Sequence, residues 1–85
     1  MVVTTAFSIE GRDIQEYLGI VSAAMVMAMS GGNKGAQRGW QSGVEGTTQI
    51  LKQQASDLGA DAIIAVKYEP HGMNICATGT AVKLA

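Results

Sequence analysis

Residues 55–66 read ASDLGADAIIAV, and within this stretch a helical pattern ends and a strand pattern begins. Leu58 is the last member of an apolar stripe with helical spacing. Gly59 follows it and can adopt the left-handed conformation that often ends a helix, which costs other residues roughly 1 kcal/mol or more. Residues 62–66 are then all apolar and partly β-branched, as in a strand that is covered on both faces. The stretch predicts a helix that ends at a glycine and is followed at once by a buried strand.

The helix before Gly59 is predicted over residues 43–58. Its apolar face carries five side chains that are three or four residues apart: Val44, Thr48, Leu51, Ala55 and Leu58. Ser42 stands where an N-cap residue is expected, and Glu45 follows it at the offset of a capping box. We therefore expect the helix to begin directly after Ser42.

Strands are predicted on both sides of this helix. Before it, the residue pattern favours a short strand at 2–5 and a longer one at 14–26, with a turn between them. After it, residues 60–69 and 73–84 are predicted to form a hairpin through a turn at residues 70–72. The predicted fold class is α+β, a single domain over residues 1–85 in which one helix lies on a small antiparallel sheet in a two-layer β-α-β-β arrangement.

The composition indicates a small domain that associates with copies of itself. The chain has 85 residues, of which 47% are hydrophobic and 15% are charged, whereas about 25% is a typical charged fraction. A domain of this size buries only about 60–65% of the surface that its unfolded chain exposes. Its single cysteine cannot form an internal disulfide. We therefore expect a homo-oligomer.

Charge and hydropathy argue against two classes of partner. The net charge is −1, whereas nucleic-acid-binding domains are usually strongly basic, so we expect no nucleic-acid partner. Residues 17–29 are apolar but shorter than the roughly 20 residues that a helix needs to cross a bilayer. Residues 1–5 lack the basic start and cleavage site of a signal peptide. We therefore expect no membrane partner and a cytoplasmic location.

Three segments of the chain resemble the YbjQ-like family. They are Thr4-Thr5 with residues 8–11 (SIEG) and 14–22 (IQEYLGIVS), then residues 57–66 (DLGADAIIAV), and then residues 77–82 (ATGTAV). They occur in the family's order and cover most of the chain outside residues 29–45. The resemblance implies a dodecin-like β-α-β-β subunit that assembles into a ring, usually a pentamer. It also brings a heavy-metal-binding label without an established activity and without a ligand motif that can be placed on this sequence.

One segment departs from the family pattern. Family members usually carry a longer helical insert between the second strand and the main helix, whereas residues 30–43 here are short and rich in glycine. We interpret residues 30–43 as a flexible loop. A function that resides in the family's insert therefore does not transfer directly to this chain.

Soft metal ligands are few in this chain. His71 and Cys76 are five residues apart across the predicted turn, and imidazole with thiolate suits zinc or copper. The alternative is a turn histidine and a cysteine that packs as a small hydrophobic residue. Met25, Met27 and Met29 alternate along the chain, and thioethers bind copper(I), but the same pattern is typical of core or interface side chains. The only cofactor that the sequence suggests is a divalent or soft metal ion.

Residues 31–40 (GGNKGAQRGW) form the strongest candidate for a ligand site. A glycine-rich backbone can present N–H groups to an anion, Lys34 and Arg38 add positive charge, and Trp40 offers a stacking surface. The P-loop pattern is absent, because no lysine followed by serine or threonine ends the segment. The segment favours a site for a small phosphate-bearing ligand, and the alternative is a surface loop with one anchoring tryptophan.

The sequence provides no evident catalytic set. His71 is the single histidine, and the sequence assigns it no serine, cysteine or carboxylate partner. We therefore predict a non-enzymatic binding or scaffold protein, which by the family resemblance forms a ring with ligand pockets between its subunits. The alternatives are a heavy-metal-binding protein that uses His71 and Cys76, and a small enzyme that acts on a phosphate ester through residues 34–40.

Overall fold

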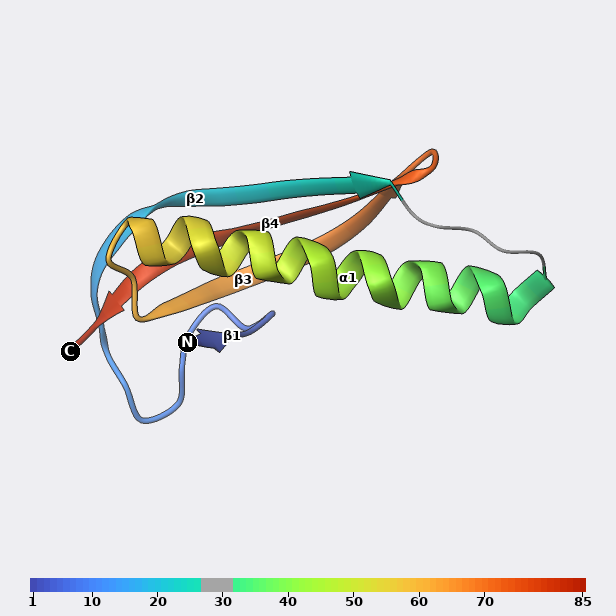
Figure 1. The fold of residues 1–85 in the computed structure, drawn as a ribbon. Helices are drawn as coiled ribbons and strands as arrows, with labels where there is room; N and C mark the ends of the chain where they lie inside the picture. The colour runs from blue at the N-terminus through green and yellow to red at the C-terminus, as the bar shows by residue number, and fades with distance from the viewer. Residues whose placement is uncertain (27–31) are drawn as a thin grey trace.

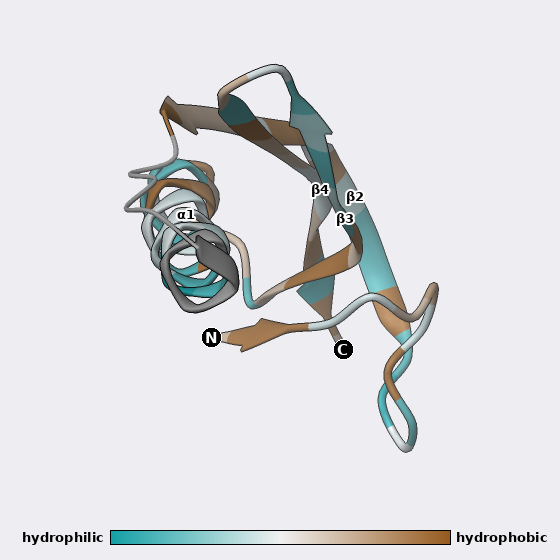
Figure 2. Ribbon diagram, turned by 90° about the vertical axis from the view of Figure 1, so that its right-hand side faces the viewer, coloured by the Kyte–Doolittle hydropathy of each residue, from teal (hydrophilic) through white to brown (hydrophobic). Residues whose placement is uncertain are grey.

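The computed structural model describes residues 1–26 and 32–85, with side chains in the second range described from residue 37 onward. Its elements along the chain are β1 (Val2–Val3), β2 (Ile14–Val26), α1 (Gly32–Asp57), β3 (Ala62–His71) and β4 (Asn74–Leu84), as Figure 1 shows. The helix lies on one side of the sheet (Figure 2). No helix among the described residues is both long and apolar enough to cross a membrane.

The strands form one mixed sheet in the order β1-β3-β4-β2. β3 and β4 form the predicted hairpin, and β2 pairs antiparallel with β4 from Ile14↔Leu84 to Val26↔Asn74. β1 instead pairs parallel with β3, with Val2 opposite Ala62. The prediction of a purely antiparallel sheet is therefore wrong at this edge. Residues 4–13 cross from the β3 edge to the β2 edge, so β1 and β2 lie at opposite sides of the sheet and do not pair.

The main core lies between α1 and the sheet. Its buried members are Val21, Leu51, Ala55, Ile63, Val66, Ala77 and Ala81. The helix ends near the predicted glycine: Gly59 has φ of 79°, and the N–H of Ala60 donates to the carbonyl of Ala55 at 2.9 Å. Leu58, predicted to complete the apolar stripe, is 47% exposed, and α1 ends one residue earlier, at Asp57.

The loop predicted at residues 30–43 is wrong from Gly32 onward, because α1 already begins there. Ser42 consequently lies inside the helix and is not its N-cap. Gly43 and Gly46 face the sheet, where a Cβ on Gly43 would overlap Ile75 and one on Gly46 would overlap Met25. A glycine lowers helix propensity by about 1 kcal/mol relative to alanine. At Gly43 and Gly46 the lower helix propensity is offset by a close approach of α1 to the sheet. With the helix in this position, a larger residue at either site would overlap the sheet.

The hairpin turn lies further along the chain than predicted. Pro70 and His71 belong to β3, and the turn consists of Gly72 and Met73. Gly72 has φ of 62°, and a glycine at the first position of a two-residue turn suits the twist of the flanking strands. Proline is tolerated in β3 at this point because the strand lies at the edge of the sheet beyond the short β1.

The sheet face opposite α1, here called the outer face, is covered at one end. There Ala62, Ile64, Val82 and Leu84 form a second buried cluster against Ile9 of the N-terminal segment (residues 1–13) and Ile14 of β2. Figure 2 shows the chain after β1 passing to this side of the sheet, away from the helix. Beyond the cluster, the register places eleven residues on the outer face: Ile20, Ser22, Ala24 and Val26 of β2, Asn74, Cys76, Thr78 and Thr80 of β4, and Lys67, Glu69 and His71 of β3.

Candidate functional site

Exposed apolar side chains gather on the outer face. The four most exposed large hydrophobic residues of the described chain all lie on this side: Ile20 at 82%, Phe7 at 77%, Val26 at 71% and Tyr17 at 68%. Tyr17 belongs to the outer face because it is paired with Val82 of the second cluster. Burying a large apolar side chain contributes about 1.5–3 kcal/mol, so the outer face is the surface on which a partner would gain most.

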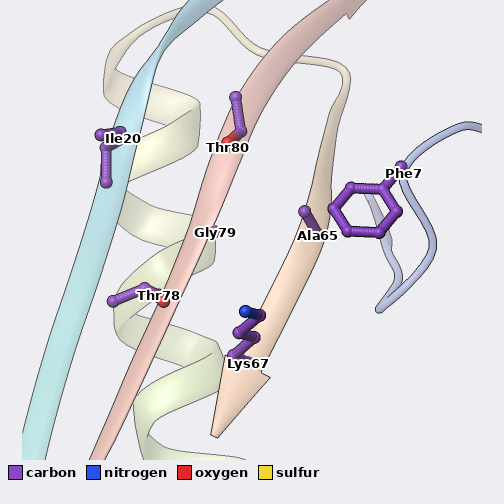
Figure 3. A pocket seen from close by; sticks show the side chains of 7 residues that line it. All are labelled: Phe7, Ile20, Ala65, Lys67, Thr78, Gly79 and Thr80. Atoms are coloured by element: carbon purple, nitrogen blue, oxygen red, sulfur yellow. The ribbon is translucent and has the colours of Figure 1, made fainter.

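A shallow pocket of about 290 Å³ opens on this face. It is lined by Phe7, Ile20, Ala65, Lys67, Thr78, Gly79 and Thr80. Figure 3 shows Ile20 on β2 at one side, Phe7 and Ala65 at the other, and β4 between them. Lys67 projects beside Thr78, its partner in the register. The pocket thus combines two apolar walls with hydroxyl groups and one cation.

A β-bulge in β3 determines which side chains reach this pocket. Ile64 pairs with Thr80 and Lys67 pairs with Thr78, so two residues of β3 stand opposite Gly79 alone. Ala65 has φ of 53°, a conformation that L-residues other than glycine rarely adopt. In a regular strand, alternation would put Lys67 on the opposite face from Ile64. The bulge therefore turns Lys67 to the outer face and Val66 into the core.

The same bulge holds the N-terminal segment in place. The N–H of Ala65 donates to the carbonyl of Ala6 at 2.8 Å, and the N–H of Val66 donates to the carbonyl of Thr4 at 3.1 Å. Thr4 in turn donates its N–H to Ile63 at 3.0 Å. Phe7 follows directly after Ala6, so these hydrogen bonds fix the backbone next to Phe7, whose ring forms the aromatic wall of the pocket.

Lys67 is an exposed cation without a carboxylate partner among the described residues. The one ion pair in that part of the chain joins His71 Nε2 and Glu69 Oε2 at 3.8 Å, and both side chains are well exposed. None of the side-chain hydrogen bonds found among the described residues uses the hydroxyl of Thr78 or Thr80. The polar groups of the pocket are thus free to bind a ligand.

The predicted metal ligands share the outer face. Glu69 pairs with Cys76 and His71 pairs with Asn74, so Cys76, Glu69 and His71 all lie on that side. Within the part of the chain that is described, no three histidine, cysteine or acidic residues are close enough together to hold a metal ion. Of the methionines, Met25 points toward Gly46 of the helix, whereas Met27 and Met29 lie outside the described residues.

The predicted ligand residues Lys34, Arg38 and Trp40 belong to α1 and not to a loop. Arg38 is exposed and Trp40 is half-buried, and the side chain of Lys34 is outside the described set. Residues two apart on a helix point in nearly opposite directions, so Arg38 and Trp40 do not converge within one subunit. Trp40 lines a separate open hollow of about 510 Å³ with Gln41, Val44 and Glu45. The ligand site at these residues stays a prediction.

The sequence contained only a partial signal for the outer-face pocket. Thr78 and Thr80 alternate in the sequence with the small residues Ala77, Gly79 and Ala81, and in the structure the small residues face the core. The sequence does not indicate Lys67 or Phe7 as pocket residues. Neither the bulge nor the crossing of the N-terminal segment produces a periodic residue pattern.

Comparison with known proteins places the chain in a family. A family model described as "Putative heavy-metal-binding", YbjQ, matches residues 29–85. The chain belongs to the YbjQ-like family. It is 36% identical to a UPF0145 protein of Anoxybacillus flavithermus, covering 99% of this chain and 98% of that protein. It is 35% identical to a UPF0145 protein of Geobacillus kaustophilus, again covering 99% and 98% of the two chains.

A solved structure has the same fold as this YbjQ-like protein. It is a crystal structure of a DUF74-family protein of unknown function from Pediococcus pentosaceus, with a TM-score of 0.75 and 22% sequence identity. It covers all of this chain, and 98% of its own chain is matched. The small α+β fold with one helix on a four-stranded sheet is therefore shared. Neither the family description nor these relatives' names mention a catalytic activity.

The alignments with the relatives contain more positions than this chain has residues. Alignments with these two relatives extend over 103 and 105 positions, whereas this chain has 85 residues. The relatives therefore carry residues that this chain lacks.

Proposed function

We propose that this protein is a non-enzymatic, ring-forming homo-oligomer, a pentamer as the family resemblance implies, that acts as a binding or scaffold protein. The observation that carries the proposal is the gathering of Ile20, Phe7, Val26 and Tyr17 on the outer face. Burying a side chain of this size contributes about 1.5–3 kcal/mol. Burying any three of the four would therefore offset much of the free energy, several kcal/mol, that two subunits lose in translational and rotational entropy when they associate.

Association through this face is favoured over strand addition. The free edge of β2 is occupied at Ser22, whose N–H donates to Gln54 Oε1 at 3.0 Å and whose carbonyl accepts from Gln54 Nε2 at 2.7 Å. The free edge of β3 carries Pro70, which lacks an N–H. Both edges are thus poor templates for another strand, and the open apolar face is the better contact.

A ring requires the outer face of one subunit to meet a different surface of the next. The helix lies on the other side of each subunit, and it carries the predicted ligand residues Lys34, Arg38 and Trp40. A head-to-tail contact would bring the helix side of one subunit toward the outer face of its neighbour. The proposed ligand, a small phosphate-bearing molecule, then binds between subunits.

Native mass spectrometry of the purified protein tests the assembly. We expect a single closed oligomer, and we expect the double variant Ile20→Glu, Val26→Glu to be monomeric with an unchanged circular dichroism spectrum. Met73→Glu is the matched control, because Met73 is 55% exposed but lies in the hairpin turn. A monomeric wild type, or an intact oligomer in the double variant, refutes the proposed contact. Hydrolysis of a generic phosphate ester by the wild type refutes the non-enzymatic assignment.

Heavy-metal binding is the second candidate function, and one observation favours it. His71 and Cys76 lie on the same face, and imidazole with thiolate suits zinc, although the described residues of one subunit form no set of three ligands. A ring would repeat this group in every subunit. Zinc titration followed by calorimetry tests it: binding that is lost in Cys76→Ser and in His71→Ala supports this function, and binding that survives in both contradicts it.

A further inference from the structure

We infer that the outer-face pocket between Phe7 and Ile20 binds a small organic anion, namely a carboxylate or phosphate group attached to a planar apolar body. Lys67 holds the anionic group, and Phe7 and Ile20 enclose the apolar body. The inference rests on the proposed function and names a ligand class and a place for it: the pocket lies on the face that is proposed to contact the next subunit, so the ligand would lie between subunits.

The charge of the pocket favours an anion. Lys67 stands opposite Thr78 and has no carboxylate within ion-pair distance among the described residues. The hydroxyls of Thr78 and Thr80 can donate to the same anionic group. Hydrogen bonds from an ammonium to a carboxylate or phosphate are stronger than those between neutral groups. The set is therefore suited to an oxyanion and offers no acidic side chain to a cation.

The shape of the pocket favours a flat apolar body. Ile20 on β2 and Ala65 on β3 are separated by β4, a span of two strand spacings or about 10 Å. The volume of about 290 Å³ is at the lower end of the range of small-molecule sites. Figure 3 shows the ring of Phe7 standing beside Ala65 at the rim. A single ring with one anionic substituent fits these dimensions, and its binding would cover Phe7, which is 77% exposed.

The local backbone supports a site that is built and not incidental. The bulge at Ala65, with φ of 53°, is an uncommon conformation for a residue other than glycine. Its effect is to bring Lys67 to the outer face and to bind Ala6, so that the cation and the start of the aromatic wall are positioned by the same two residues of β3. Bulges often redirect a side chain at binding sites in this way.

The test is a titration of the ¹⁵N-labelled protein followed by NMR. The probes are benzoate, phenyl phosphate, inorganic phosphate and benzyl alcohol, which separate the anionic group from the apolar body. We expect benzoate and phenyl phosphate to move the amide signals of Thr78, Gly79 and Thr80. Inorganic phosphate, which lacks the apolar ring, and benzyl alcohol, which lacks the anionic group, should each bind about tenfold more weakly. Whichever aromatic anion binds more tightly identifies carboxylate or phosphate as the preferred group.

Two lysine variants localise the charge. Lys67→Met keeps the aliphatic stem and should weaken benzoate and phenyl phosphate about tenfold while leaving benzyl alcohol unchanged. Lys83→Met is the matched control, because Lys83 is an exposed strand lysine on the opposite face of the sheet. Thr78→Val gives a second, smaller loss. Equal binding by both lysine variants overturns the inference, and so do signals that move only around Trp40 or do not move at all at millimolar probe.

Native mass spectrometry of the same samples separates this inference from the proposed assembly. A monomer whose Thr78, Gly79 and Thr80 signals respond to the aromatic anions contradicts the ring and supports the pocket. A closed oligomer whose signals do not respond contradicts the pocket and supports the ring.

Discussion

Replacing Gly43 by alanine tests how closely α1 lies on the sheet. Alanine raises helix propensity by about 1 kcal/mol relative to glycine. The new Cβ would overlap Cγ2 of Ile75, a fully buried residue whose β-branched side chain has little freedom to rotate. Overpacking of this kind costs about 1–3 kcal/mol. We therefore expect Gly43→Ala to lower the free energy of unfolding by about 1 kcal/mol, net of the gain in propensity.

Gly46→Ala is the matched comparison, because the same change meets a different neighbour. Its Cβ would overlap the thioether of Met25, which is flexible and 37% exposed. Met25 can swing aside at little cost, so the gain in propensity remains and stability should rise by as much as about 1 kcal/mol. The two variants should thus differ by about 2 kcal/mol in opposite directions.

Urea unfolding followed by circular dichroism measures both variants. All samples need the same protein concentration, because oligomer formation makes apparent stability depend on it. A Gly43→Ala variant as stable as Gly46→Ala would refute the close approach. The double variant Gly43→Ala, Ile75→Ala gives an independent check: removing the obstruction should make its loss smaller than the sum of the single losses.

Three further predictions concern side chains that form hydrogen bonds, and each is measured by urea unfolding. Gln54→Ala removes both bonds to the backbone of Ser22, so it should cost about 1 kcal/mol and promote aggregation through the freed edge of β2, detected by light scattering; Gln53→Ala, which loses only a bond to Asp57, should do neither. Tyr68→Phe removes the hydroxyl pair with Thr48 Oγ1 at 2.6 Å and should cost about 0.5–1.5 kcal/mol, whereas Tyr17→Phe, at an exposed residue, should be neutral; equal effects would contradict the assignment. Asp61→Ala leaves the N–H of Leu84 without its acceptor at 2.9 Å and should cost about 1 kcal/mol, and an unchanged midpoint would show that water replaces the carboxylate.

The sequence predicted those elements whose signals are local. Gly59 does end the helix region with a positive φ, and β2 spans residues 14–26 as expected. The first half of α1 was not predicted, because residues 30–43 are rich in glycine and were interpreted as a loop. The spacing of these glycines matters only once the sheet that they approach is known. β1 was placed in an antiparallel sheet because nothing in residues 2–5 states which strand it will join.

The candidate site depended on non-local features to a greater degree. His71 and Cys76 lie on the same face, which only the register between β3 and β4 could establish. Lys67 could not be assigned to the outer face from alternation, because counting by twos from Ile63 places it in the core. The extra residue of the bulge moves Lys67 to the other face, and no residue type in the sequence indicates that a bulge is present.

The bulge also determines which face of the sheet each later residue of β3 occupies. Straightening the strand with Ala65 retained would exchange inside and outside for every later residue, so that Lys67, Glu69 and His71 would point toward the helix and Tyr68 away from it. Deleting Ala65 would leave the inside and outside assignments as they are, while removing the N–H that binds Ala6. One position therefore allows the two roles of the bulge, orienting β3 and tethering the N-terminal segment, to be separated by a single deletion.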